Sequence, residues 1–171
     1  MSAAAPGFFI ETCASPCSNP SGQTPAPGQI AALNCNTNVN GCDDHVNGMA
    51  NPANPGSTIQ LFLTGQGGAL KGTVPADGEA VCGQVNTQAM PEVVIGTTIA
   101  SSVTYSGIAP CEVGLWQINV VIPSNPGQPA TAGWPTNVFP VLVKYNGAVT
   151  DPPQDFANPS LAGTIVINTA P

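Results

Sequence analysis

Glycine and proline limit what this chain can fold into more than any other feature. The sequence holds 19 glycines and 19 prolines among its 171 residues. One of these two residues interrupts every window in which apolar side chains could recur at helical spacing over three turns. Because both are poor in helix interiors, we expect an all-β chain of short strands separated by many turns.

Residues 114–122 show the alternation of a half-buried strand most clearly. Apolar residues that begin with Trp116 occupy one face of this segment, and Gln117 and Asn119 lie on the other. We expect the apolar face to point to the core and the polar pair to point to solvent.

About eight strands are predicted in this way, at a spacing typical of β-sandwiches. They lie at residues 7–10, 29–33, 57–64, 92–95, 101–105, 114–122, 138–145 and 163–168. Pro140 should place the first half of its strand at an edge or a bulge. Asn146-Gly147 predicts a tight hairpin turn directly after that strand.

Length and charge set the domain count and exclude two classes of partner. A chain of 171 residues is expected to form one domain, 1–171. Two lysines, no arginine and nine acidic residues give a net charge of -7, which excludes nucleic-acid binding. No apolar run approaches the ~20 residues of a membrane span, so no transmembrane segment is expected.

Six cysteines indicate an oxidising, extracellular compartment. An even number in a short chain is typical of a disulfide framework, and the spacing does not match a structural zinc site. The spacing favours the pairs Cys13–Cys17, Cys35–Cys42 and Cys82–Cys111. The main alternative exchanges partners among the first four cysteines.

Three long loops and one terminal segment complete the predicted organisation. Residues 13–28 and 35–56 are rich in Asn, Pro, Ser and Gly and carry four of the six cysteines, so we expect local disulfides to order them. Residues 124–137 are proline-containing and should be extended and exposed. Residues 1–10 have no signal-peptide pattern, which indicates a mature chain or an excised fragment.

Several segments, taken in order, resemble one known family. The most specific motif is Asn51-Pro-Ala-Asn-Pro-Gly-Ser-Thr-Ile, which leads into a strand. The matching segments are residues 5–9, 31–34, 51–67, 74–75, 91–96, 103–110, 113–123, 140–143 and 165–167. Together they resemble the uncharacterised C-terminal domain of large secreted acidobacterial proteins, often called the Solibacter-type C-terminal domain.

The resemblance implies an immunoglobulin-like antiparallel β-sandwich of about 7–9 strands, secretion and a place at the bacterial cell surface. It implies no reaction and no catalytic residue. The chain departs from the family pattern in its cysteines and in its enlarged loops. These departures suggest a subunit in its own right rather than a passive terminal module.

A weak calcium candidate lies in residues 36–47. Oxygen-bearing side chains alternate there around a central glycine, and Asp43 and Asp44 would be the ligands. The first three ligand positions carry no carboxylate, and Asn47 stands where a bidentate acid is required. A disulfide-closed, Asn-rich turn is the favoured interpretation, and we expect no metal or cofactor.

Catalysis is not expected. His45 is the only histidine, and no Gly-x-Ser-x-Gly motif accompanies it. The acid pairs at residues 77/79 and 151/155 lie in turn-like segments, which do not by themselves make the facing carboxylates of a glycoside hydrolase. We therefore predict a protein that is not an enzyme.

Two weak binding candidates remain, and they define the predicted function. Phe8, Phe9 and Ile10 form an apolar segment that could be donated to a neighbouring copy, although the simpler interpretation is a first strand of its own sandwich. We predict an extracellular structural or adhesive protein, with a self-assembling filament joined by strand addition as its specific form. The alternative is a carbohydrate-binding module with an exposed Trp134 loop and surface glycans as partners.

Overall fold

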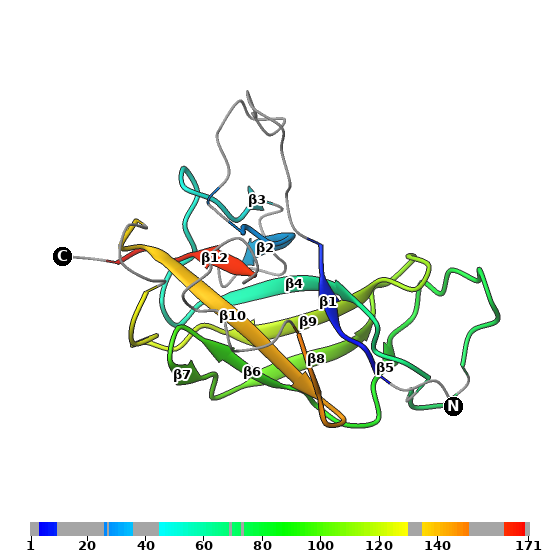
Figure 1. The fold of residues 1–171 in the computed structure, drawn as a ribbon. Helices are drawn as coiled ribbons and strands as arrows, with labels where there is room; N and C mark the ends of the chain where they lie inside the picture. The colour runs from blue at the N-terminus through cyan, green and yellow to red at the C-terminus, as the bar shows by residue number, and fades with distance from the viewer. Residues whose placement is uncertain are drawn as a thin grey trace.

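The computed structural model describes residues 4–9, 26, 28–35, 45–68, 70–72, 74–129, 135–150 and 163–169. Within these ranges the chain forms strands, turns and loops and contains no helix. The strands build two antiparallel sheets, one of seven strands and one of five (Figure 1). The prediction of an all-β antiparallel sandwich is confirmed.

The seven-stranded sheet is organised around β4. Its order is β3-β2-β4-β9-β8-β5, and β1 also pairs with β4. β9 pairs along one side of β4, whereas β2 and β1 share the other side. The bounds are β1 Gly7–Phe8, β2 Ala32–Cys35, β3 His45–Val46, β4 Thr58–Thr64, β5 Val85–Asn86, β8 Val103–Ile108 and β9 Trp116–Val121.

The five-stranded sheet is organised around the long strand β10. Its order is β11-β10-β6-β7, and β12 also pairs with β10. The first half of β10 pairs with β12, and pairing with β6 begins only at Val141, directly after Pro140. Asn146 and Gly147 adopt positive φ values of 49° and 82° and form the expected turn into β11. The bounds are β6 Glu92–Ile95, β7 Thr98–Ile99, β10 Val138–Tyr145, β11 Ala148–Val149 and β12 Thr164–Val166.

The hydrophobic core lies between the inner faces of the two sheets. Alternation along each strand sends every second side chain inward, which buries these residues almost completely. The seven-stranded sheet contributes Ile59, Leu61, Leu63, Trp116, Ile118 and Val120, and the five-stranded sheet contributes Val93, Ile95, Val143, Tyr145 and Ile165. The apolar face predicted for residues 114–122 is therefore confirmed.

The described part of the chain contains twelve strands rather than about eight. The four additional strands are β3, β5, β7 and β11, and each has two residues. A two-residue strand cannot display an alternating pattern, so it leaves no signal in the sequence. These short strands form the ends of both sheets.

Two of the predicted loops are more ordered than expected where the structure describes them. The 35–56 loop contains β3 and an isolated bridge between Gly48 and Asn51. In the 124–137 loop, Pro126 is buried, and its carbonyl oxygen accepts a hydrogen bond from Thr97 N at 3.0 Å. The expectation of an extended, exposed loop is wrong for this turn, because it packs onto the hairpin between β6 and β7.

Candidate functional site

The sequence predicts that all six cysteines form disulfide bonds. Cys82 is bonded to Cys111, which is the long-range pair that the spacing favoured. Cys35 is also disulfide-bonded. Cys13, Cys17 and Cys42 lie outside the described residues, so the pairing among the first four cysteines stays a prediction.

The other predicted site residues do not meet in one place. Asp43, Asp44, Trp134 and Ile10 lie outside the described residues. His45 is exposed in the end strand β3. Of the predicted self-assembly residues, Phe8 and Phe9 lie within the described ranges.

The two phenylalanines differ in how much of each side chain reaches solvent. Phe8 packs against the core and lies directly over Gly163, where an added Cβ would come within 2.6 Å of its ring. Phe9 is 47% exposed, and its carbonyl oxygen accepts a hydrogen bond from Ala31 N. In this chain Gly7–Phe8 form a strand that pairs with β4 of the same sandwich, which agrees with the simpler of the two interpretations.

The acid pair at residues 77/79 lies in an exposed turn. Glu79 Oε2 accepts a hydrogen bond from Ala76 N at 2.8 Å, which ties this carboxylate to its own turn. Both acids line a hollow of about 220 Å³ beside Ile108 and Val113. Residues 151 and 155 lie outside the described ranges.

A buried cluster of amides includes Asn47, the last residue of the calcium pattern in the sequence. Asn47, at the twelfth position of that pattern, is 1% exposed. Its Nδ2 donates to Asn34 Oδ1 at 2.9 Å and to Val166 O at 2.7 Å, and its Oδ1 accepts from Val166 N at 2.7 Å. Gln29 Nε2 donates to Asn47 O at 2.6 Å. The cluster therefore joins β2 to β12, and the Asn47 side chain is fully used inside the protein.

Three end strands of the sheets expose an apolar side chain to solvent. β3, β7 and β11 each present one exposed β-branched residue, namely Val46 (48% exposed), Ile99 (60%) and Val149 (39%). None of these three strands contains Lys, Arg, Asp or Glu. Soluble proteins usually protect sheet edges with very short edge strands, charges, prolines or bulges. These three edges are only two residues long each, but they carry no charge.

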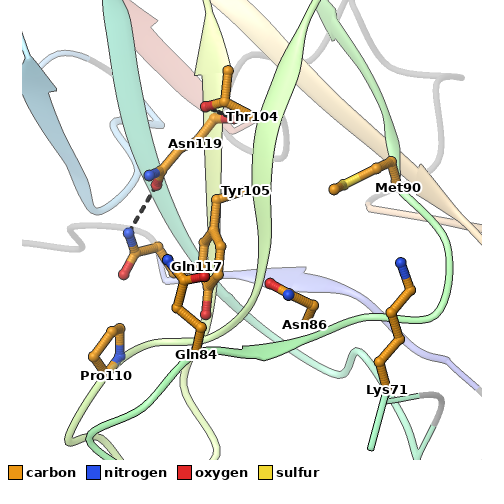
Figure 2. A pocket seen from close by; sticks show the side chains of 9 residues that line it. All are labelled: Lys71, Gln84, Asn86, Met90, Thr104, Tyr105, Pro110, Gln117 and Asn119. Atoms are coloured by element: carbon orange, nitrogen blue, oxygen red, sulfur yellow. Dashed lines mark hydrogen bonds between the residues drawn. The ribbon is translucent and has the colours of Figure 1, made fainter.

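A polar pocket of about 340 Å³ opens on the outer face of the seven-stranded sheet (Figure 2). Its floor consists of side chains of β8 and β9 that point away from the core, among them Tyr105, Gln117 and Asn119. Gln117 Nε2 donates to Asn119 Oδ1 at 2.8 Å. Gln117 is only 8% exposed, so the expectation that it faces open solvent is wrong. It lies on the expected outer face, where it lines the same pocket as Asn86 of β5.

The wall of the pocket is the chain around β5. Lys71, Gln84, Asn86 and Met90 line this side. In Figure 2 Lys71, Asn86 and Met90 are drawn on one side of the Tyr105 ring, and Gln117 and Asn119 on the other. The wall therefore supplies four side chains from outside β8 and β9.

Two contacts tie this wall to β8 and to the turn after it, and two further hydrogen bonds lie within the wall. The Thr87 hydroxyl lies 2.8 Å from Ser106 Oγ and donates to Ala89 O at 2.7 Å. Lys71 N donates to Asn86 O at 2.7 Å. The Cys82–Cys111 disulfide ties the start of the wall to the turn between β8 and β9. The wall is therefore fixed from both sides.

Tyr105 lies flat in this pocket because Gly107 leaves room for it. Its hydroxyl donates to Ile108 O at 2.6 Å. A Cβ on Gly107 would stand 2.7 Å from that hydroxyl and would also collide with Val85 O. Burial raises the pKa of Tyr105, and a backbone hydrogen bond with Val85 offsets part of this rise.

Sequence reasoning identified Gln117 and Asn119 as an outward polar pair but did not predict a pocket. The missing signal is the β5 segment, which is distant in sequence and has only two residues in strand conformation. On the neighbouring strand β8, a tyrosine stands two residues before a glycine. This local pattern could have indicated a covered site.

Comparisons with family models, curated proteins and solved structures find no match to this chain. In the part of the chain that the structure describes, no helix is long and apolar enough to cross a membrane. The same residues contain no group of three or more His, Cys, Asp or Glu that could hold a metal ion.

Proposed function

We propose that this protein is a non-enzymatic, extracellular structural or adhesive protein that self-associates by pairing the end strands of its sheets. The observation that carries the proposal is the set of uncharged end strands β3, β7 and β11. Each has an exposed β-branched side chain, and each can accept a further strand by main-chain hydrogen bonding.

The composition of the chain supports the same proposal. Only 6% of the residues are charged, so few charges oppose contact between copies. Disulfide bonds support an oxidising, extracellular setting. A place on the bacterial cell surface, and assembly into filaments, are the specific forms of the role that we propose.

The end strands are better candidates for the contact than the N-terminal segment. β1 already pairs with β4 of its own chain, and Ala5 N donates to Gly65 O at 2.7 Å. Donating this segment to a neighbour would first break those bonds and expose Phe8. Pairing at β3, β7 or β11 breaks no strand pairing, because each of them pairs with one strand only among the described residues.

The test compares assembly of the wild-type protein with that of an edge variant. Light scattering over a dilution series and electron microscopy should show concentration-dependent oligomers or fibres for the wild type. Val46→Lys, Ile99→Lys and Val149→Lys together should remove them, because a lysine on an edge opposes strand addition. Val113→Lys is the matched control, since Val113 is 56% exposed and lies outside every strand.

Two results would contradict the proposal. A wild-type protein that stays monomeric at every concentration would exclude self-association. Assembly that survives the triple variant but is lost in Phe9→Lys would place the contact at the N-terminal segment instead.

A further inference from the structure

We infer that the pocket between the β5 segment and the β8–β9 face is a binding site for a neutral, hydroxyl-rich saccharide. This inference does not depend on the proposed self-association. The pocket lies on the outer face of the sheet, whereas the edges that we propose for assembly are β3, β7 and β11. Its volume of about 340 Å³ lies within the range of about 300–1,000 Å³ for small-molecule sites.

The chemistry of the lining favours a ligand with many hydroxyl groups. Four amide side chains converge on the pocket, and each can donate and accept hydrogen bonds, as a sugar hydroxyl can. They are Gln84, Asn86, Gln117 and Asn119. Thr104 adds a hydroxyl group at the upper end in Figure 2.

Several of these polar groups can still form hydrogen bonds with a ligand. Neither Gln84 nor Asn86 makes a side-chain hydrogen bond to any residue that the structure describes, and Lys71 makes no ion pair there. Gln117 spends one donor and Asn119 one acceptor on their mutual hydrogen bond, which fixes their orientation and leaves the amide nitrogen of the more exposed Asn119 available. The arrangement is a pre-oriented set of donors and acceptors.

Apolar contact comes from two ends of the pocket. Met90 is 52% exposed, and Figure 2 shows its side chain directed toward the pocket. Pro110 lines the opposite end, beside the disulfide. These groups can cover the C–H face of a sugar ring while the amides hold its hydroxyls, and an adaptable methionine suits this task.

The same lining argues against other ligand classes. It contains no Asp, Glu, His or Cys, so it offers no ligand set for a metal ion. Lys71 is its only charged residue, and a chain with a net charge of -7 repels polyanions. A peptide strand would need a free sheet edge. The floor strands β8 and β9 are paired with neighbours on both sides, and on the end strand β5 the Asn86 carbonyl already accepts a hydrogen bond from Lys71 N.

The experiment titrates the intact, oxidised protein with defined oligosaccharides by calorimetry. The probes are the hexamers of β-1,4-linked glucose, mannose, xylose and N-acetylglucosamine, with a hexamer of galacturonic acid as the charged comparison. We expect at least one neutral hexamer to bind. Gln84→Ala combined with Asn119→Ala should weaken that binding about tenfold or more, because hydrogen bonds to the hydroxyls are lost.

Gln128→Ala is the matched control. Gln128 is an exposed amide outside the pocket, so its removal should leave the affinity unchanged. Side-chain amide signals of the wild-type protein, followed by NMR during the titration, give a readout that does not depend on any variant folding. The signals of the four pocket amides should move, and those of Gln128 should stay.

Three outcomes would overturn the inference. One is the absence of binding by every neutral hexamer up to about 10 mM. Another is binding that leaves the pocket amide signals and the double variant unaffected, which would place the sugar elsewhere on the protein. The third is binding of the galacturonate hexamer alone, which would show an anion site at Lys71 rather than a site for neutral sugars.

Discussion

The indole ring of Trp116 lies 5.2 Å from the phenol ring of Tyr145, measured between centroids, and the two ring planes are tilted by 57°. Trp116 belongs to β9 of the seven-stranded sheet and Tyr145 to β10 of the five-stranded sheet, so this contact joins the two layers. Trp116 Nε1 also donates to Ser106 Oγ at 3.0 Å. Both the ring and the polar atom of the tryptophan are therefore satisfied inside the core.

Trp116→Ala should lower the free energy of unfolding by about 3–5 kcal/mol, the usual cost of removing a large buried aromatic side chain. Trp116 is 0% exposed, and its removal leaves a cavity between the sheets. Urea denaturation followed by circular dichroism measures the change. Val113→Ala, at a site 56% exposed, should change the stability by no more than about 0.5 kcal/mol. Equal losses of unfolding free energy in the two variants would contradict the role of Trp116 as a core residue.

The alternation of apolar residues predicted the sandwich because a buried core requires an apolar side chain at every second position of its strands. Strands β6 and β10 occupy the expected residues, 92–95 and 138–145, and Trp116 lies in the core as its position in the pattern indicated. A half-buried strand needs one apolar face, and that requirement is visible in the sequence.

The amide cluster and the pocket could not be predicted in the same way. Asn47 looked like a turn residue, because nothing local shows that its side chain will meet Val166. The outward direction of Gln117 was predictable, but the pocket that it shares with Asn86 of β5 is formed by residues distant in the sequence. Long-range polar contacts carry no periodicity, so residue patterns do not report them.

Asn47→Ala should destabilise the protein by about 3 kcal/mol. The change leaves Val166 N and Asn34 Oδ1 buried without the partners they have in the wild type, and each such group costs about 1–3 kcal/mol. Chemical denaturation gives the difference. Asn51→Ala is the control, because Asn51 Nδ2 makes only an exposed bond to Val46 O at 3.3 Å, and its loss should cost less than about 1 kcal/mol. A small effect of Asn47→Ala would show that water replaces the amide.

Tyr105→Phe should change how stability depends on pH in the alkaline range. Because burial raises the pKa of Tyr105, the folded protein keeps the phenol proton at a pH where the unfolded chain, with a pKa near 10, releases it. This stabilisation is fully present below about pH 10 and is lost as the pH rises through the folded-state pKa. Urea unfolding of both proteins at about pH 9 and about pH 11 should show the wild type losing stability relative to Tyr105→Phe. A difference in stability between the two proteins that does not change with pH would contradict a raised pKa of Tyr105.

Replacing both Cys82 and Cys111 by serine should lower the stability by about 3–4 kcal/mol, because the bond closes a loop with a sequence separation of 29. The effect should be largest near the pocket, since the bond ties the start of the β5 wall to the turn after β8. Hydrogen exchange at Val85 and Ile108, which pair across β5 and β8, should accelerate more than exchange in β10. Ala80→Ser introduces the same side chain at an exposed position two residues before Cys82 and should leave exchange unchanged. Uniform acceleration across both sheets would mean that the disulfide supports the whole sandwich rather than the wall of the pocket.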